Sequence, residues 1–300
     1  MNETVTPDAK RRGGRRERRD LRTRPDHAML PTLTGQLPLT EPMDQEQIER
    51  IDTASLDILE EVGVVFRDDM ALEDWREAGA DVRGERVHLD RGLVKSLIKT
   101  IPSKITLHAR NPEKTVALGG RQSIFIPMTG APYLRDLEDV RRSPTLDDLA
   151  TFHKLAHMLS AMHSSAHHIV EPMDHPISHR HLRITHSSML YSDKTFMGMT
   201  TSGQNAEDVL DMCAILFGSE YLETHAVVTG NCNGNSPLVW DETMLSAMRA
   251  FNRRNQPVLC SPFVLGGANT PASTVPTVAQ LNAEALSALA YTQVIRSGCP

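Results

Sequence analysis

The 300-residue sequence is poor in the features that mark several large protein classes. Aromatic residues make up only 4% of it. No apolar run approaches the roughly 18 residues of a membrane-spanning helix. The basic N-terminus is not followed by the apolar stretch of a secretory signal. We therefore expect a protein that makes no membrane contact.

Cysteine is scarce as well, with four residues and no CxxC pair. Such a set does not indicate a disulfide framework and suits a reducing cytoplasm. The phosphate-binding patterns GxGxxG and GxxxxGK[ST] are absent, as is the HExxH spacing of zinc peptidases. These absences argue against the common nucleotide-binding folds.

Charge is distributed unevenly along the chain. Residues 1–24 contain nine Lys or Arg and four Asp or Glu, whereas the whole chain has a net charge of −6. Between Lys10 and Arg24 the only large apolar residue is Leu21, which is too little for a core. We expect residues 1–29 to form a disordered basic arm before an acidic body. Binding to nucleic acid or to an acidic partner is the alternative, but the body contains no nucleic-acid motif.

Residues 30–143 show mixed helical and strand patterns. A Pro- and Thr-rich linker is expected at 30–42. Asp44 and Gln47 then have the spacing of a capping box, and apolar residues follow at helical intervals as far as Val62. Further helices are predicted over 70–78 and 90–101, and short strands over 104–109, 115–118, 123–126 and 133–136. The pattern predicts an N-terminal α+β subdomain.

From residue 144 the pattern becomes regular. Capping pairs at Thr145 with Asp148 and at Asn205 with Asp208 predict two helix starts. Other helices are predicted over 178–191, 241–252 and 279–295, and strands over 166–170, 195–200, 226–230 and 258–261. Strands about 30 residues apart with helices between them are typical of βαβ units in a parallel sheet. The sequence therefore predicts an α/β fold in which 144–300 form the first half of a (β/α)8 barrel, with the other half missing from the chain.

Four blocks of the sequence resemble the trimethylamine methyltransferase (MttB-like) family, whose members demethylate methylated amines and quaternary ammonium compounds. They are LTEPMDQEQIERIDTASLDILEEVGV, DRGLVKSLIKTIPSKITLHARNPEKTVALGG, IFIPMTGAPYLRDLEDVRRSPTLDDLATFHKLAHML and VLGGANTPASTVPTVAQLNAEALSALAYTQVIRSGCP. The resemblance implies a complete barrel in longer members and methyl transfer from an amine nitrogen to the Co(I) of a partner corrinoid protein. One branch of the family uses pyrrolysine. None is visible here, so the resemblance favours the quaternary amine branch, which includes enzymes for glycine betaine.

Candidate site residues follow the predicted strands, because active groups of barrels lie at the carboxyl ends of strands. Transfer from a quaternary amine releases a neutral amine, so the protein must chiefly position a cation, with carboxylates or aromatic faces. Glu171 and His168 are the predicted catalytic residues. His167 and His168 should point to opposite faces of a strand. A surface salt bridge for Glu171 and a core position for each histidine are the structural alternatives.

Small polar and aromatic residues near the same strand ends are candidates for substrate binding. Thr201 is suited to the carboxylate of a betaine, although capping of the next helix explains it equally well. The full set is Thr129, His167, Thr201, Asn231, Asn233 and Phe263, with Phe125, Tyr133 and Phe196 as further cage candidates. Loop formation for the asparagines and core packing for the rings are the alternatives.

Two other functions stay open. Cys232 and Cys260 lie near strand ends, as in a zinc-dependent thiol methyltransferase, but the histidines of HPISHRHLRITH lack a ligand spacing and we expect no metal site. A non-catalytic protein that binds a quaternary amine is the second. We expect a cytoplasmic amine methyltransferase that takes its corrinoid from a partner protein, binds no cofactor tightly, and is able to form homo-oligomers.

Overall fold

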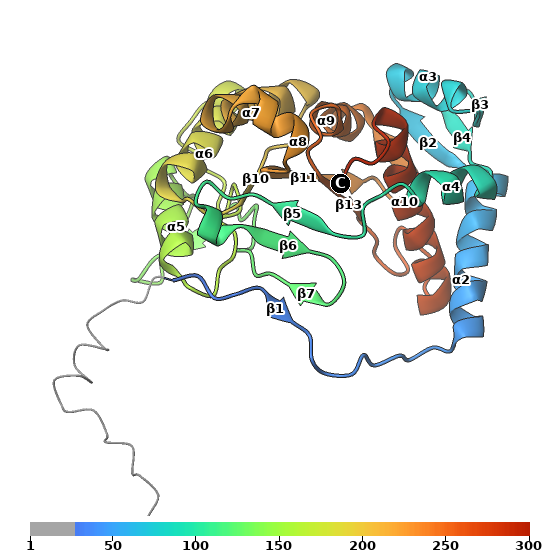
Figure 1. Ribbon diagram of the computed structural model, residues 1–300, viewed down its shortest axis with the longest axis horizontal. Helices are drawn as coiled ribbons and strands as arrows, with labels where there is room; N and C mark the ends of the chain where they lie inside the picture. Colours follow the sequence, from blue (N-terminus) through green and yellow to red (C-terminus); the bar gives the residue numbers. More distant parts are fainter. Residues whose placement is uncertain (1–27) are drawn as a thin grey trace, which may run out of the picture.

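A small parallel sheet with an arc of helices along its outer side dominates the mixed α/β fold (Figure 1). The computed structural model describes residues 28–300, so the predictions for the basic arm lie outside the described residues apart from positions 28 and 29. Within the described part, no helix has both the length and the apolar character needed to cross a membrane.

The parallel sheet has the strand order β10 (Phe196–Met197), β11 (Val228–Gly234) and β13 (Val258–Pro262). The predicted strand at 258–261 is confirmed, and β10 is shorter than the predicted 195–200. β11 begins two residues later and continues four residues further than the predicted 226–230, because Asn231 to Gly234 pair with β13. The carboxyl ends of these strands meet at one edge of the sheet.

The strand predicted at 166–170 is not formed. Ala166 has a φ of 54°, which interrupts the extended backbone. The segment is held by isolated parallel bridges, from Ser164 to Thr195 on one side and from Val170 to Ala131 on the other. It therefore still runs parallel to β10, and its end lies on the same side as the carboxyl ends of the sheet.

The helices of this region are α5 (Leu146–Met158), α6 (Ile177–Tyr191), α7 (Gly203–Phe217), α8 (Ser219–Thr224), α9 (Glu242–Arg253) and α10 (Thr274–Ile295). Five of them correspond to predicted helices, whereas α8 was not predicted and α10 begins before the predicted start at 279. The capping box of Thr145 and Asp148 is confirmed at the start of α5. The start predicted for α7 is wrong, because the Ser202 hydroxyl, which accepts the Asn205 amide, caps this helix instead.

The N-terminal region contains a sheet that the sequence did not predict. The capping box of Asp44 and Gln47 is confirmed at the start of α2 (Gln45–Asp57), which continues as a π-helical turn over Ile58–Val62. The sheet order is β12 (Val239–Asp241), β2 (Val64–Arg67), β4 (Arg86–His88) and β3 (Asp81–Arg83), flanked by α3 (Asp69–Glu77) and α4 (Arg91–Ile98). β12 comes from the region after residue 144, so the two regions share this sheet.

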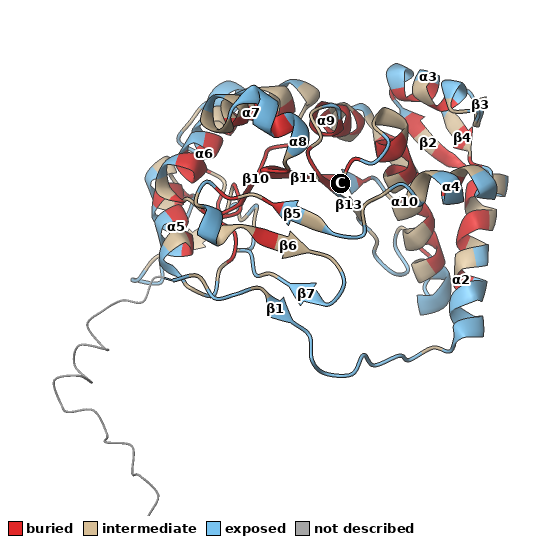
Figure 2. Ribbon diagram, viewed as in Figure 1, coloured by how far each residue is buried: buried red, intermediate tan, exposed pale blue. Residues whose placement is uncertain are grey.

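A buried ion pair also joins the two regions. Both terminal nitrogens of Arg249 in α9 donate to the Asp68 carboxylate, at 2.8 and 2.5 Å, and one also donates to the Tyr291 hydroxyl of α10. The rings of Phe66, Trp75 and Tyr291 pack edge-on or tilted, with centroids 5.5–5.8 Å apart. Figure 2 shows buried residues along the strands and on the helix sides that face them, and one apolar core spans both regions.

Short antiparallel pairs complete the first region. β5 (Ile105–Leu107) pairs with β6 (Val116–Leu118), and the 3-10 turn Pro112–Lys114 lies between them. The expected linker contains β1 (Leu33–Thr34), which pairs with β7 (Gln122–Ser123), and β8 (Leu134–Arg135) pairs with β9 (Arg141–Arg142). The His108 amide donates to the Ala226 carbonyl at 2.8 Å, so the β5–β6 hairpin lies at the amino-terminal end of β11.

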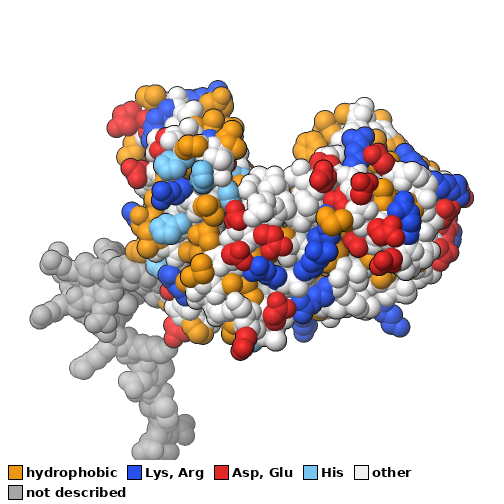
Figure 3. All heavy atoms as spheres, turned by 90° about the horizontal axis from the view of Figure 1, so that it is seen from above, with side chains coloured by type: hydrophobic (Ala, Val, Ile, Leu, Met, Phe, Trp, Pro, Cys, Tyr) orange, Lys and Arg blue, Asp and Glu red, His pale blue; other side chains and the backbone are white. Residues whose placement is uncertain are grey.

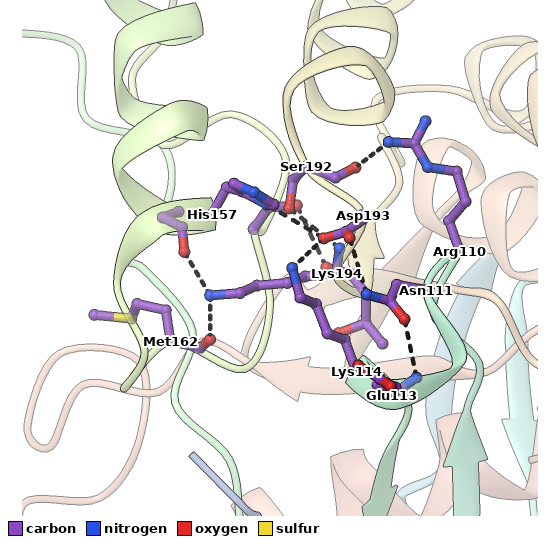
Figure 4. Close-up of polar contacts among 12 residues, drawn as sticks. Arg110, Asn111, Glu113, Lys114, His157, Met162, Ser192, Asp193 and Lys194 are labelled. Atoms are coloured by element: carbon purple, nitrogen blue, oxygen red, sulfur yellow. Dashed lines mark hydrogen bonds and ion pairs between the residues drawn. The ribbon is translucent and has the colours of Figure 1, made fainter. Parts of the chain in front are cut away.

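A polar cluster lies on the amino-terminal side of the parallel sheet (Figure 4). The buried Lys194 ammonium donates to the carbonyls of Ala156, Leu159 and Met162 at 2.7–2.8 Å, which satisfies carbonyls at the end of α5. Asp193 accepts from the Lys114 ammonium at 2.5 Å. Burial lowers the pKa of Lys194 to about 8.

Candidate functional site

Glu171 forms an ion pair at the carboxyl-side edge of the parallel segments. Its amide donates to the Ala131 carbonyl at 2.9 Å, which fixes the end of the segment that begins at Ser164. Its carboxylate accepts from Arg180 Nη1 at 2.9 Å, and the two side chains are 26% and 14% exposed. Arg180 lies in the first turn of α6, and the sequence analysis did not select it.

His167 and His168 contact each other directly. The rings have centroids 3.9 Å apart, and His167 Nε2 is hydrogen-bonded to His168 Nδ1. The prediction that they point to opposite faces is wrong, because the backbone at Ala166 is not extended. His167 is buried, and no residue of the described chain bonds to its Nδ1.

A third histidine, His153 of α5, lies beneath this pair. Its Nε2 is 2.6 Å from the His167 carbonyl oxygen and its Nδ1 is 2.9 Å from the Ser187 hydroxyl. Because a carbonyl can only accept, Nε2 must carry a proton, and in the neutral ring Nδ1 accepts from Ser187. Burial lowers the pKa of His153 to about 4, lowers the pKa of His167 well below its usual value, and lowers that of His168. The three rings are therefore neutral near pH 7 and do not repel a cation.

Thr129 belongs to a segment packed against His168. The Gly130 amide donates to the His168 carbonyl at 2.7 Å, and Gly130 has a φ of 81°. This positive φ favours glycine, and a Cβ atom on Gly130 would lie 3.4 Å from His168 Nε2, so the segment lies directly against the ring. The structure thus brings Thr129, His167, His168 and Glu171 together.

Asn231 and Asn233 lie in a second polar group, on β11. Asn231 accepts from the Thr200 hydroxyl through its carbonyl at 2.6 Å and from the Ser261 hydroxyl through its side chain at 3.0 Å. The strand was predicted to end before both asparagines, but they are part of it because β11 continues alongside β13. Because all these segments are parallel, Asn231 and Asn233 lie towards the same edge of the sheet as Glu171.

The remaining candidates do not converge on either group. Thr201 is exposed and accepts from the Asn205 amide nitrogen Nδ2 at 2.8 Å, within the capping region of α7. Phe263 is 70% exposed just beyond β13. The Arg141 guanidinium already lies over the Tyr133 ring, 4.0 Å from its centroid. Phe196 is buried in the core and Phe125 stacks on His163, so residues 28–300 do not assemble these rings into a cage.

Within residues 28–300, no set of three or more His, Cys, Asp or Glu could hold a metal ion. Cys232 and Cys260 are register partners in the sheet, but burial raises the pKa of Cys232 well above its usual value and that of Cys260 to about 12. Histidine side chains are visible over part of the surface (Figure 3). The buried His181 of α6 has its Nε2 atom 2.8 Å from Oδ2 of Asp208 in α7, so this nitrogen contacts a carboxylate and not another histidine.

Comparison with known proteins places the chain in one family. A family model described as trimethylamine methyltransferase (MTTB) matches residues 11–300. The chain belongs to this family. The glycine betaine methyltransferase of Desulfitobacterium hafniense (strain Y51) is 39% identical over 265 residues, which cover 88% of this chain and 55% of that protein.

More distant members of the trimethylamine methyltransferase family also match. The trimethylamine methyltransferase MttB of Desulfitobacterium hafniense (strain DSM 10664 / DCB-2) is 26% identical, over 85% of this chain and 52% of its own length. The proline betaine:corrinoid methyltransferase of Eubacterium limosum is 26% identical, over 84% of this chain and 54% of its own length. The chain spans about half the length of the curated relatives it matches.

Proposed function

We propose that the protein transfers a methyl group from a methylated or quaternary amine to the Co(I) of a corrinoid protein. Membership of the trimethylamine methyltransferase family supports this, as do relatives named for glycine betaine, proline betaine and L-carnitine. The observation that carries the proposal is the position of Glu171 beside His168, a neutral histidine, where parallel segments end. His168 therefore adds no positive charge beside Glu171 that would repel a substrate cation.

The proposed architecture is the first part of a (β/α)8 barrel over residues 144–300, with residues 1–29 as an arm and 30–143 as an N-terminal subdomain. The row of parallel segments supports it, because neighbours in the row follow one another in the sequence. Large apolar side chains are exposed beside the outer segments: Met128 is 85% exposed and Leu259 of β13 is 45% exposed. Further strands of a barrel would cover them.

The residues have distinct proposed roles. The corrinoid supplies a nucleophilic cobalt that accepts the methyl group. Glu171 attracts the substrate ammonium, and His168, kept neutral by burial, packs beside it. Thr129, His167, Asn231 and Asn233 are proposed to bind the rest of the substrate, whereas Thr201 and Phe263 lie apart from both polar groups and are given no role. Because a quaternary amine leaves as a neutral tertiary amine, these residues need to position the methyl group and need not supply a proton.

The proposed cytoplasmic location is supported by four free cysteines, three of them buried. A zinc-dependent thiol methyltransferase is the less favoured alternative, because the described chain offers no group of three ligands. Metal analysis of the purified protein distinguishes the two.

The test is a methyl-transfer assay on the protein expressed from its complete reading frame. The reaction contains Co(I) corrinoid and, in separate samples, glycine betaine, trimethylamine and choline, and it follows formation of methylated corrinoid by absorbance. We expect transfer from at least one amine, and Glu171→Gln should reduce kcat/KM by about 10- to 100-fold, the value of one charged contact. If none of the amines donates a methyl group but one of them binds, the protein is an amine-binding protein and the proposal is wrong.

A further inference from the structure

The carboxylate at the centre of the candidate site is already neutralised. Glu171 and Arg180 are in direct contact, and both side chains are largely covered. A ligand that approaches Glu171 therefore meets a dipole and not a net negative charge. A purely cationic ligand is attracted by one end of this dipole and repelled by the other.

Arg180 also has hydrogen-bonding capacity left. Its Nε and Nη2 donate to the His175 carbonyl at 3.3 and 2.9 Å, and its Nη1 donates to Glu171. A guanidinium has five N–H groups. The bonds to described residues therefore leave one N–H on Nη1 and one on Nη2. These two N–H groups belong to neighbouring nitrogens of one planar guanidinium, a group that can donate to both oxygens of a carboxylate, and the bonds to His175 hold it in place.

We propose that Arg180 makes the site selective for quaternary amines that carry a carboxylate, an inference that rests on the proposed function. The ammonium of such a zwitterion faces Glu171 and its carboxylate faces Arg180, so that the four charges alternate in sign. The neutral rings of His167 and His168 add no charge that disturbs this arrangement. Arg180 is thus a specificity-determining residue that sequence spacing alone did not reveal.

Glycine betaine and choline are the matched probes for this inference. Both carry a trimethylammonium group on a methylene carbon, and they differ in having a carboxylate or a hydroxymethyl group beyond it. The methyl group to be transferred and its nitrogen are the same. The ratio of kcat/KM for the two amines therefore isolates the contribution of the carboxylate.

The experiment compares the protein from its complete reading frame with Arg180→Met, Arg180→Lys and Arg183→Met. Arg183 is exposed on the same helix and serves as the control. For each protein, methyl transfer from both amines is measured, and binding of each amine without corrinoid is measured by calorimetry. We expect Arg180→Met to lower the betaine-to-choline ratio by about 10- to 100-fold, as for loss of a charged hydrogen-bonded pair. Arg180→Lys should recover part of the ratio, and Arg183→Met should leave it unchanged.

The outcomes separate this inference from the proposed function. If Arg180→Met lowers both kcat/KM values equally, Arg180 only positions Glu171 and the inference is overturned, while the methyltransferase function stands. If the unmodified protein transfers a methyl group from neither amine, the proposed function fails, and calorimetry still decides the role of Arg180. Binding of betaine that is equally tight in Arg180→Met rejects the inference, and weakening confined to betaine supports it. Thermal unfolding of each variant confirms that it is folded.

Discussion

Acid should destabilise this protein through His153. The side chain is fully buried beneath the candidate site, between the Ser187 hydroxyl and the His167 carbonyl. Burial lowers its pKa from the ordinary 6.5 to about 4, because the charged imidazolium would lose its water. The fold therefore accommodates the neutral ring, and protonation must oppose folding.

The pH window follows from these two pKa values. Between about pH 6.5 and about pH 4 the unfolded chain binds a proton at His153 that the folded chain does not bind. The free energy of unfolding therefore falls as the pH falls through this window, and most of the loss has occurred by pH 4. A difference of about 2.5 pKa units is worth about 3 kcal/mol. His167 and His168 act in the same direction, because burial lowers the pKa of each.

The assay is urea unfolding followed by tryptophan fluorescence, since Trp75 and Trp240 are both fully buried. His153→Gln keeps a donor for the His167 carbonyl but cannot titrate. The difference in unfolding free energy between the unmodified protein and this variant should shrink by about 3 kcal/mol from about pH 7 to about pH 4. The exposed His186 provides the control, because His186→Gln should keep the full pH dependence. A difference that stays constant across the window would refute the claim that the fold holds His153 neutral.

Three further outcomes are expected. Arg249→Met leaves the buried Asp68 carboxylate without its partner and should cost about 3–5 kcal/mol in urea unfolding, part of which Asp68→Asn should restore in the double variant; full additivity of the two single changes would contradict this. Lys194→Met removes the donor that three backbone carbonyls share, so it should lower the free energy of unfolding by roughly 3 kcal/mol. An unchanged urea midpoint would rule this out. Protonation of His168 in mild acid puts a positive charge near Glu171, so KM for the amine should rise as the pH falls below 6.5. His168→Asn should remove that rise, and parallel pH profiles of the two proteins would disprove the electrostatic role of His168.

Features set by neighbouring residues were predictable from the sequence. Both capping boxes, of Asp44 with Gln47 and Thr145 with Asp148, depend on side chains three residues apart, and both are formed. The four-stranded sheet was missed because its strands are three or four residues long and pair across distant parts of the chain. β12, for example, pairs with β2, and neither has enough residues to show an alternating pattern.

The candidate site was only partly predictable for a related reason. The position of Glu171 after the strand-like run at 166–170 indicated a strand end; that strand is not formed, but the segment still lies parallel to its neighbours up to Val170. Its partner Arg180 comes from the following helix, and the turn that joins them is not encoded in a local motif. The contact of His167 with His168 depends on a positive φ at Ala166, a conformation that alanine rarely adopts and that sequence spacing does not reveal.

The balanced charges of the site also bear on product release in the proposed reaction. In the proposed site a betaine would bind as a zwitterion, with its ammonium beside Glu171 and its carboxylate beside Arg180. Removal of one methyl group turns the ammonium into a neutral amine, so the product keeps only its carboxylate. Until the amine takes up a proton from solvent, Glu171 would face no positive charge on the ligand and would repel the nearby carboxylate. In the proposed reaction, the pair of Glu171 and Arg180 would therefore hold the substrate more tightly than the product at the moment of its formation.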